Sequence, residues 1–519
     1  MASRSTTSWA MRLLAGTLLI GLPIAISFWT ICIIFQSSPW TYLPRNHDET
    51  LFWIDANSFY HVGLQGGYSG FEEMLGFAPR LGIGLYGGHG FFAFFLATII
   101  GKLIGFPEYS GINFAYFFYF AAAAIFFVAR WRGRSDMLLF AALFIGSFFP
   151  FFSHLILNWQ ETLHVSVAIA LASIFMSLIS EDAHTPKRRN AFIIGFVLLL
   201  LASLLRYSWA LLYLPLFLFT RKPGKWGYIR STIAGFLMIG VCYIMYKLIS
   251  APYPYGKFGF NYLEGLFSEG FSSKHYLDYL AWNIEFFFSF ERDNVHDKLL
   301  LWTMSSFVFA APVLTYLFQN KIEGVGKNGT TAADLTLFHI INMGGLFIFS
   351  IFWYYPNTRL LAPCFLLSLV IMTSYLPSRW YYIVLVASLM LLPVNLENHR
   401  DGQTDTYPIK QEYEYLSNKY KTYGREMAKT IRYIPDSSPW CNTLMLLDWT
   451  KRDFLDVPPG IAIHFFKEPE KHDLPYKSHY IFIMNDEQYS QVTRTTKIEQ
   501  LWKSDHGTLY LNLDAQCQK

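Results

Sequence analysis

Long apolar runs alternate with short polar segments from residue 10 to residue 395. A run of about 20 apolar residues is long enough for a helix to cross the hydrocarbon core of a bilayer. The pattern predicts about eleven crossings, with one further apolar segment that does not cross. The predicted apolar segments are 10–36, 89–106, 110–128, 136–157, 162–179, 192–205, 209–219, 232–249, 299–318, 335–355, 360–375 and 381–393.

Lys and Arg predict which ends of these segments face the cytoplasm, because positive loops stay inside. Arg4 and Arg12 flank the start of the first segment, so the N-terminus is expected inside and the loop 37–88 outside. Two full crossings by 89–106 and 110–128 would export the arginines within 130–134. One of these two segments is therefore expected to be re-entrant or to lie along the interface. The odd number of crossings leaves the C-terminus outside.

The apolar stretch from residue 192 to 219 is interrupted by Arg206, Tyr207 and Ser208. Each half is roughly 15 residues, or about 22 Å as a helix, which is short of a bilayer core of about 30 Å. We expect two shortened helices that meet at a polar turn lined by protein. The alternative, one long tilted helix, would export the basic residues that follow position 220.

Two other regions lie outside the apolar pattern. The segment 250–296 is rich in Tyr, Phe and Gly, and we expect an external loop with an interfacial helix near 275–290. Residues 396–519 are polar and carry short alternating stretches such as 479–484, which predict a small α/β domain on the external face. The predicted organisation is thus a transmembrane domain, 1–395, followed by an external domain, 396–519. Cys441 and Cys517 share that domain, where a disulfide could form.

Composition agrees with an integral membrane protein. Of 519 residues, 53% are hydrophobic and only 15% are charged, against roughly 25% charged in an ordinary soluble domain. This composition excludes intrinsic disorder and a disulfide-stapled mini-domain. A net charge of +4 is too near neutral to suggest a nucleic-acid partner. The predicted fold class is therefore an α-helical polytopic membrane protein with a small C-terminal α/β domain.

Ionisable side chains beside the membrane are costly, so they are the candidates for function. Four of them are predicted at the external ends of spans: Asp55, Glu161, Arg206 and Arg359. A carboxylate there can act as a general base, and arginine matches phosphate oxygens bidentately. A purely structural role is open to three of the four: a helix N-cap for Asp55, a first-turn acid for Glu161, and snorkelling to the interface for Arg359.

Weaker candidates lie in the first loop. Arg80 and His89 could assist in binding an anion, and Asp48 with Glu49 forms a rival acidic pair that is more readily explained by solvation. No spacing of Cys and His typical of a metal site occurs in the sequence. We expect no required cofactor, although Glu161 leaves room for a divalent cation.

Four motifs, in order along residues 1–395, resemble the GT-C superfamily of integral membrane glycosyltransferases. More narrowly, they are similar to the branch that includes protein mannosyltransferases and aminoarabinose transferases. They are Asp55 with Tyr60 five positions on, the segment 88–108 that contains His89, Glu161 with the two residues after it, and the segment 357–363 that contains Arg359.

The resemblance implies an inverting transfer of a monosaccharide from a polyprenyl-phosphate donor on the external face. It implies that Asp55 activates the acceptor hydroxyl. Glu161 is expected to be catalytic as well, by assisting this base. Donor binding would involve Arg359, Arg206, Arg80, His89 and Tyr60. The acceptor could be a surface glycan such as O-antigen, a lipid or a protein. The expected location is a bacterial inner membrane, with the C-terminal domain in the periplasm.

Two other functions remain as alternatives. A flippase or transporter of lipid-linked sugar would place charged groups near the bilayer midplane, often within internal repeats. A polysaccharide polymerase or ligase would use a lipid diphosphate donor. The clustering of ionisable groups at one face favours the transferase.

Overall fold

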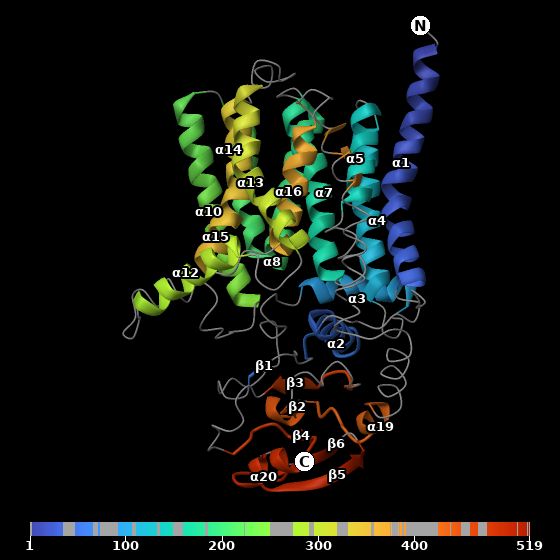
Figure 1. Ribbon diagram of the computed structural model, residues 1–519, viewed down its shortest axis with the longest axis vertical. Coiled ribbons are helices and arrows are strands. Elements are labelled where there is room, and N and C mark those ends of the chain that lie inside the picture. The colour runs from blue at the N-terminus through green and yellow to red at the C-terminus, as the bar shows by residue number, and fades with distance from the viewer. Residues whose placement is uncertain are drawn as a thin grey trace. The chain divides into compact units, whose positions relative to one another are not determined.

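Figure 1 shows the computed structural model of the chain. The residues it describes are 3–34, 47–65, 71–72, 92–105, 111–131, 135–148, 159–181, 185–222, 224–249, 273–289, 295–318, 331–353, 358–375 except 374, short pieces within 382–390, 424–447 except 436, 457–465, 475–515 except 506, and 517. They divide into two compact units. Unit 1 comprises 1–34, 115–244 and 255–403, and unit 2 comprises 35–114, 245–254 and 404–519.

Unit 1 is a helical bundle, and α4 and α10 run across its boundaries with unit 2. Its helices are α1 (Ser3–Trp29) with the π-helix η1 (Thr30–Ile34), α4 (Gly111–Arg130), α5 (Ser135–Ser147), α7 (Trp159–Ser180), α8 (Pro186–Leu205), the 3₁₀ helix η4 (Tyr207–Leu212), α9 (Tyr213–Phe219), α10 (Lys225–Ile249), α12 (Ser273–Phe288), α13 (Val295–Leu317), α14 (Ala332–His339), the π-helix η6 (Ile340–Gly344), α15 (Gly345–Trp353) and α16 (Thr358–Met372).

Seven helices among the described residues are long and apolar enough to cross a membrane. These spans begin at residues 9, 113, 159, 186, 225, 298 and 332. The chain is therefore a multi-pass membrane protein, whereas the predicted count of about eleven crossings is not confirmed. The shortfall has a physical reason, since four further apolar helices are shorter than a bilayer core requires.

One of the short helices bears on the choice between segments 89–106 and 110–128. The first contains α3 (Phe92–Ile104), whose 13 residues span about 20 Å. The second contains α4, which has a span of 18 residues from Asn113 to Arg130. The lengths favour 89–106 as the segment that does not cross.

The chain breaks at Arg206 as predicted, but the first of the two helices beside the break is not shortened. α8 begins at Pro186 and has 20 residues, so it includes the basic residues 187–189 that the prediction had assigned to a loop. The Thr185 hydroxyl accepts a hydrogen bond from the backbone of Arg188, and Pro186 occupies the first turn. This is a regular helix start, because proline at the first position loses no intrahelical hydrogen bond.

The helix α7 lies at the centre of unit 1, packed against both α8 and α16. Nearly all of its residues are buried, including Gln160, Glu161 and His164 in its first two turns. A helix that is enclosed by others on every side needs partners for its polar side chains. The polar first turns of α7 therefore predict interactions with neighbouring helices.

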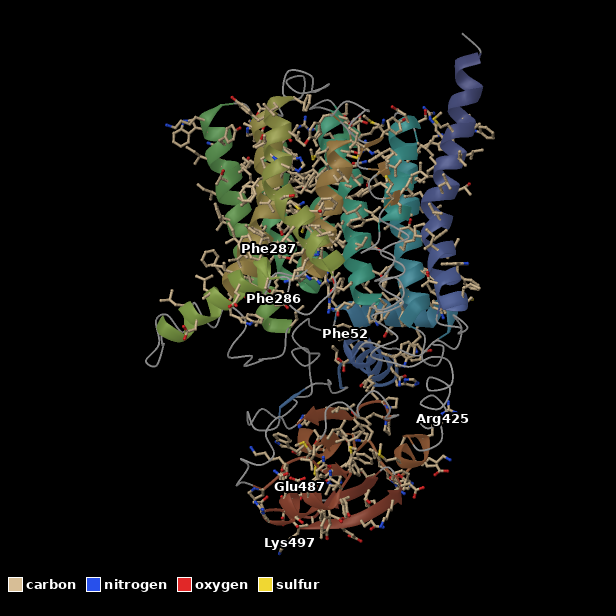
Figure 2. The ribbon with its side chains drawn as sticks, in the orientation of Figure 1. Phe52, Phe286, Phe287, Arg425, Glu487 and Lys497 are labelled. Atoms are coloured by element: carbon tan, nitrogen blue, oxygen red, sulfur yellow. A yellow bond between two sulfur atoms is a disulfide. The ribbon has the colours of Figure 1, made fainter. Side chains whose placement is uncertain are left out.

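The predicted interfacial helix near 275–290 has a counterpart in α12. Its side chains Leu277, Trp282 and Phe288 are exposed, whereas the amide of Asn283 is buried and donates to the carbonyl of Ile351. Figure 2 shows the side chains of Phe286 and Phe287 at the end of this helix. The helix itself is present, and its position at the membrane interface stays a prediction.

Unit 2 contains a six-stranded sheet with the order β1-β3-β2-β4-β6-β5. The strands are β1 (Phe71–Glu72), β2 (Thr443–Leu446), β3 (Ala462–Phe465), β4 (Tyr480–Ile483), β5 (Ile498–Ser504) and β6 (Gly507–Asn512). The first four in this order pair in parallel, and β5 and β6 are antiparallel. The other helices of the unit are α2 (His47–Val62), η2 (Gly63–Gln65), α3, α19 (Arg425–Ala428), η8 (Pro439–Asn442) and α20 (Asp486–Thr493).

The central strands of this sheet are buried on both faces. Leu444, Tyr480 and Phe482 belong to one apolar cluster, and Met445 and Ile481 belong to the other. Charged side chains such as Glu487 and Lys497 are exposed, and Figure 2 labels them. The prediction of a small C-terminal domain with strands and helices is confirmed as a mixed β-sheet domain. Its strand β1, however, comes from the first loop, which the sequence had assigned to the transmembrane part.

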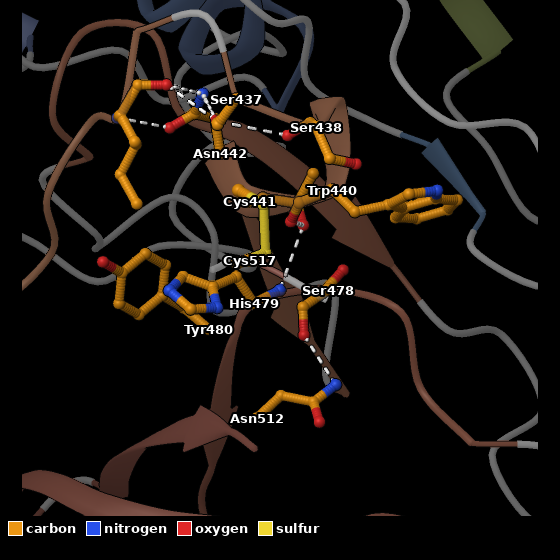
Figure 3. The surroundings of a disulfide bond; sticks show 12 residues. Ser437, Ser438, Trp440, Cys441, Asn442, Ser478, His479, Tyr480, Asn512 and Cys517 are labelled. Atoms are coloured by element: carbon orange, nitrogen blue, oxygen red, sulfur yellow. Dashed lines mark hydrogen bonds between the residues drawn. A yellow bond between two sulfur atoms is a disulfide. The ribbon is translucent and has the colours of Figure 1, made fainter. Parts of the chain in front are cut away.

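A disulfide joins Cys441 of η8 to Cys517, and its surroundings are shown in Figure 3. The two Cα atoms are 5.4 Å apart, and 76 residues separate the cysteines in sequence. Beside it, the backbone N–H of His479 donates to the carbonyl of Trp440 at 3.2 Å. The bond therefore ties the end of the chain to the entrance of β2. The other three cysteines are free.

Candidate anion-binding site

Three charged side chains from distant parts of the sequence meet at one end of unit 1. Arg206 donates from Nη2 to both carboxylate oxygens of Glu161, at 2.6 and 2.8 Å. Arg359 donates from Nε to Oε1 of Glu161 at 2.6 Å. The three residues form an ion-pair triad, which we call the Glu161 triad.

The helices of unit 1 explain why these side chains meet. Glu161 lies in the first turn of α7, Arg206 directly follows the last residue of α8, and Arg359 is the second residue of α16. Since α7 and α16 begin where α8 ends, all three positions fall at the same end of the packed helices. Arg206 has an extended backbone, with φ −152° and ψ 117°, which interrupts the helix.

Burial makes the triad electrostatically significant. The side chain of Glu161 is 2% exposed, that of Arg206 is 14% exposed and that of Arg359 is 28% exposed. Two guanidinium groups against one carboxylate leave a net charge of +1. Removing one partner of a buried ion pair leaves an uncompensated charge, which typically costs about 3–5 kcal/mol. The two arginines are the more exposed members of the triad.

A second polar contact holds the segment that follows Arg206. Trp209, in η4, donates from Nε1 to Nδ1 of His164 at 3.2 Å. His164 lies three residues after Glu161, so the bond joins η4 to the same end of α7 that carries the triad. Sequence reasoning gave His164 no role. The signal that could have identified it is its position one turn from Glu161, since residues three apart share a helix face.

The contacts of the triad bear on the structural roles that the sequence left open for Glu161 and Arg359. Glu161 is a first-turn acid of α7, as one alternative predicted, and it is also the acceptor of both guanidinium groups. Arg359 is bonded to a buried carboxylate, which accounts for its position without snorkelling.

Asp55 belongs to unit 2, so it is described apart from the triad. It is the ninth residue of α2 and is 4% exposed. The interpretation of Asp55 as a helix N-cap is therefore wrong, because α2 begins eight residues earlier. A cap prediction from sequence failed here because the helix extends back through polar residues that resembled a loop.

Tyr60 lies in the last turns of the same helix. The ammonium group of Lys102, from α3, sits over its ring at 4.1 Å from the centroid. This cation–π contact joins α2 to α3, and sequence reasoning did not find Lys102. Its signal is a single Lys near the end of an otherwise apolar helix.

The remaining candidates lie outside the part of the chain whose side chains the structure describes. Arg80 and His89 lie outside the described residues. Asp48 and Glu49 fall in the first turn of α2, where the structure describes the backbone only. Within the described ranges no group of three or more His, Cys, Asp or Glu side chains could hold a metal ion.

The opposite end of unit 1 has a different character. There Arg221 pairs with Asp334 at 2.9 Å, and Tyr228 donates to the same carboxylate at 2.8 Å. Arg130, at the end of α4, donates to the carbonyl of Ser173 near the end of α7. Arg221 and Arg130 are thus each bonded within the bundle. The basic residues nearby include Lys187, Arg189, Lys222, Lys225 and Arg230.

No protein-family model matches this chain, and no curated protein sequence matches it. Its structure is similar to the archaeal oligosaccharyltransferase AglB from Archaeoglobus fulgidus, in complex with an inhibitory peptide and a dolichol-phosphate. That similarity covers 98% of this chain and 75% of AglB, with 11% identity and a TM-score of 0.51.

Two structures of ArnT from Cupriavidus metallidurans are also similar. The apo form covers 99% of this chain and 100% of its own, with 12% identity and a TM-score of 0.49. The form bound to undecaprenyl phosphate covers 97% of this chain and 99% of its own, with 13% identity and a TM-score of 0.48. The expected resemblance to the GT-C superfamily is confirmed at the level of fold, which the similarity to AglB carries.

Proposed function

We propose that this protein is an inverting glycosyltransferase that moves a monosaccharide from a polyprenyl-phosphate donor to an acceptor hydroxyl outside the cytoplasm. The observation that carries the proposal is the Glu161 triad, in which two guanidinium groups from separate helices converge at the end of a polytopic bundle. Paired arginines match the oxygens of a phosphate, and the end of a bundle is where a lipid-linked headgroup would lie.

The charge of the triad fits this donor. A polyprenyl-phosphate sugar is a phosphodiester with one negative charge, and the guanidinium groups of Arg206 and Arg359 are positive groups of the kind that bind a phosphate. When the sugar departs, the phosphate gains a second negative charge, and guanidinium groups already held in place stabilise that charge as it develops. We assign Arg206 and Arg359 to the donor phosphate on these grounds.

The proposed transfer involves no oxidation or reduction, and each bond formed is matched by a bond broken. The acceptor oxygen forms a bond to the anomeric carbon while the bond from that carbon to the phosphate oxygen breaks. The acceptor proton passes to the carboxylate of Asp55, and polyprenyl phosphate leaves with the bonding electron pair. Attack opposite the leaving group inverts the anomeric configuration. A buried carboxylate such as Asp55 is a reasonable base, because its low exposure limits competition by water.

Glu161 is better suited to orienting the arginines than to accepting a proton. Both of its oxygens accept hydrogen bonds from guanidinium groups, so the carboxylate holds the two arginines in place. We propose this role in place of the expected one, in which Glu161 assists the base. Because two arginines already supply positive charge, the proposed reaction does not need a metal.

The sidedness of the triad follows from charge. The basic residues at the opposite end of unit 1, within 187–189 and 221–230, are expected in the cytoplasm, so the triad is expected outside. The disulfide of the C-terminal domain supports export of that domain independently, because disulfides persist in oxidising compartments.

Two measurements check this orientation. A reporter fused after Lys519 is expected to be active only outside the cytoplasm. Cys441 and Cys517 are expected to resist alkylation in the native membrane until a reductant is added. A cytoplasmic reporter signal, or free thiols at both positions, would reverse the proposed orientation.

The proposed function is tested with purified protein in nanodiscs and a panel of polyprenyl-phosphate sugars. We expect release of polyprenyl phosphate with at least one donor, and an acceptor product of inverted anomeric configuration. Polyprenyl-diphosphate sugars are the matched control and are expected to be inactive, since their headgroup carries a second phosphate for which the proposed site assigns no partner. Activity with the diphosphates alone would favour the polymerase or ligase alternative.

A further inference from the structure

We propose that the C-terminal domain positions α2, and with it Asp55, through a contact between Ser58 and Gly460. The proposal rests on the proposed function, in which Asp55 receives the acceptor proton. It concerns unit 2 alone, where α2 and the C-terminal domain both lie. Ser58 and Gly460 are positioning residues, because they act through the helix rather than on the substrate.

Two contacts fix one face of α2 on the domain. The backbone N–H of Gly460 donates to the hydroxyl oxygen of Ser58 at 3.0 Å, in a buried environment. Ile54, one turn earlier, belongs to the same apolar cluster as Leu444, Ile463 and Phe482 of the sheet. Ile54 is 8% exposed and Ser58 is 2% exposed, so both side chains are enclosed by this contact.

The opposite flank of α2 packs on α3. Phe52 lies 6.4 Å from Phe94 and Phe59 lies 6.4 Å from Phe95, measured between ring centroids. An α-helix turns by about 100° per residue, which places Ser58 about 40° from Ile54, and Phe59 about 140° from it. Asp55, at about 100°, falls between the face held by the C-terminal domain and the face held by α3. Rotation of α2 in either direction would therefore move the carboxylate.

Gly460 makes the contact with the domain side possible. Its φ of +91° is a conformation that other residues rarely adopt. A Cβ atom there would lie 2.5 Å from Cδ2 of Tyr433, which is too close for a real side chain. The position thus accepts only glycine, and it presents a backbone N–H directly to α2.

The strand that follows Gly460 is attached to the first loop a second time. Gly460 lies two residues before β3, and β3 pairs in parallel with β1, at Phe71 with His464. Both α2 and β1 come from the segment between the first helix and α3. The first loop is therefore attached to the C-terminal domain at two points, at Gly460 and at β3.

The experiment compares Ser58→Ala with the wild-type protein in nanodiscs. Loss of the hydroxyl is expected to speed amide hydrogen exchange in α2 by about fivefold to tenfold, because one buried hydrogen bond is lost. We expect kcat to fall by about tenfold to a hundredfold, since small displacements of a reacting group have effects of this size. The KM for the donor is expected to stay unchanged, because the donor phosphate is assigned to unit 1.

Asn485→Ala is the matched control. Asn485 caps α20 of the same domain by accepting a hydrogen bond from the backbone of Gln488, so its loss also removes one side-chain hydrogen bond from the domain. It is expected to change neither exchange in α2 nor kcat. Equal losses of kcat in the two variants would overturn the positioning role, as would an unchanged exchange rate or an unchanged kcat in Ser58→Ala.

The two proposals fail in different ways. A wild-type protein that transfers no sugar from any polyprenyl-phosphate donor overturns the proposed function and, with it, the positioning role. An active wild-type protein with an inactive Asp55→Asn variant and a fully active Ser58→Ala variant overturns the positioning role alone.

Discussion

Asp55→Asn is expected to reduce kcat for sugar transfer by about 10²–10⁴-fold, the usual contribution of a general base. The amide keeps the size of the side chain but does not accept the proton of the attacking hydroxyl. The substitution is nearly isosteric, which matters because Asp55 is 4% exposed and has little room to rearrange. Initial rates of polyprenyl phosphate release, with the KM for the donor, measure the effect. We expect that KM to change little.

Asp486→Asn provides the control for this experiment. Asp486 is an exposed acid in the first turn of α20, and the same chemical change there is expected to leave transfer unaffected. The folded state of both variants is checked by monodispersity and by the intact disulfide. If purified Asp55→Asn retains the wild-type kcat, Asp55 is not the base.

The bundle was largely predictable because the bilayer imposes a strong and local rule. A span must be long and apolar, and α7 and α10 satisfy the rule within their own sequences. The start of α8 was missed because its first turn is basic and so resembles a loop, although Thr185 and Pro186 carry a helix-start signal. The rule also selected apolar segments whose helices, such as α3, are too short to cross.

The site was predictable only as a set of positions. Positive-inside reasoning placed Glu161, Arg206 and Arg359 at one end of the spans, and the structure joins all three. The carboxylate of Glu161 accepts hydrogen bonds from both arginines only because α7, α8 and α16 pack together. Glu161 and Arg359 are 198 residues apart in the sequence. Sequence periodicity does not encode such distant neighbours. The pairing of β1 with β3 could not be predicted either, because β1 has only two residues and its partner is far away in the sequence.

Arg359→Ala and Arg206→Ala are each expected to raise the KM for the donor by at least tenfold and to lower kcat by about 10²–10³-fold. The second effect is the usual cost of removing one donor to a developing negative charge. Either substitution removes one of the two guanidinium groups assigned to the phosphate and leaves the other bonded to Glu161. Arg359→Lys keeps the charge but loses the planar fork, so an intermediate effect is expected. Steady-state kinetics at varied donor concentration measure KM and kcat, and direct binding of polyprenyl phosphate measures the affinity of the site.

Arg130→Ala is the matched control, because Arg130 is also a partly buried arginine bonded to α7, at the end opposite the triad. It is expected to lower thermal stability in the same way as the triad variants and yet to leave the donor KM unchanged. If all three variants lose donor affinity equally, the loss reflects the stability of α7 rather than a phosphate site. If Arg359→Ala and Arg206→Ala bind polyprenyl phosphate as the wild-type protein does, the triad is a structural ion pair and the donor must bind elsewhere. A loss of donor affinity confined to Arg359→Ala and Arg206→Ala is thus the result that separates an anion-binding site from a structural ion pair.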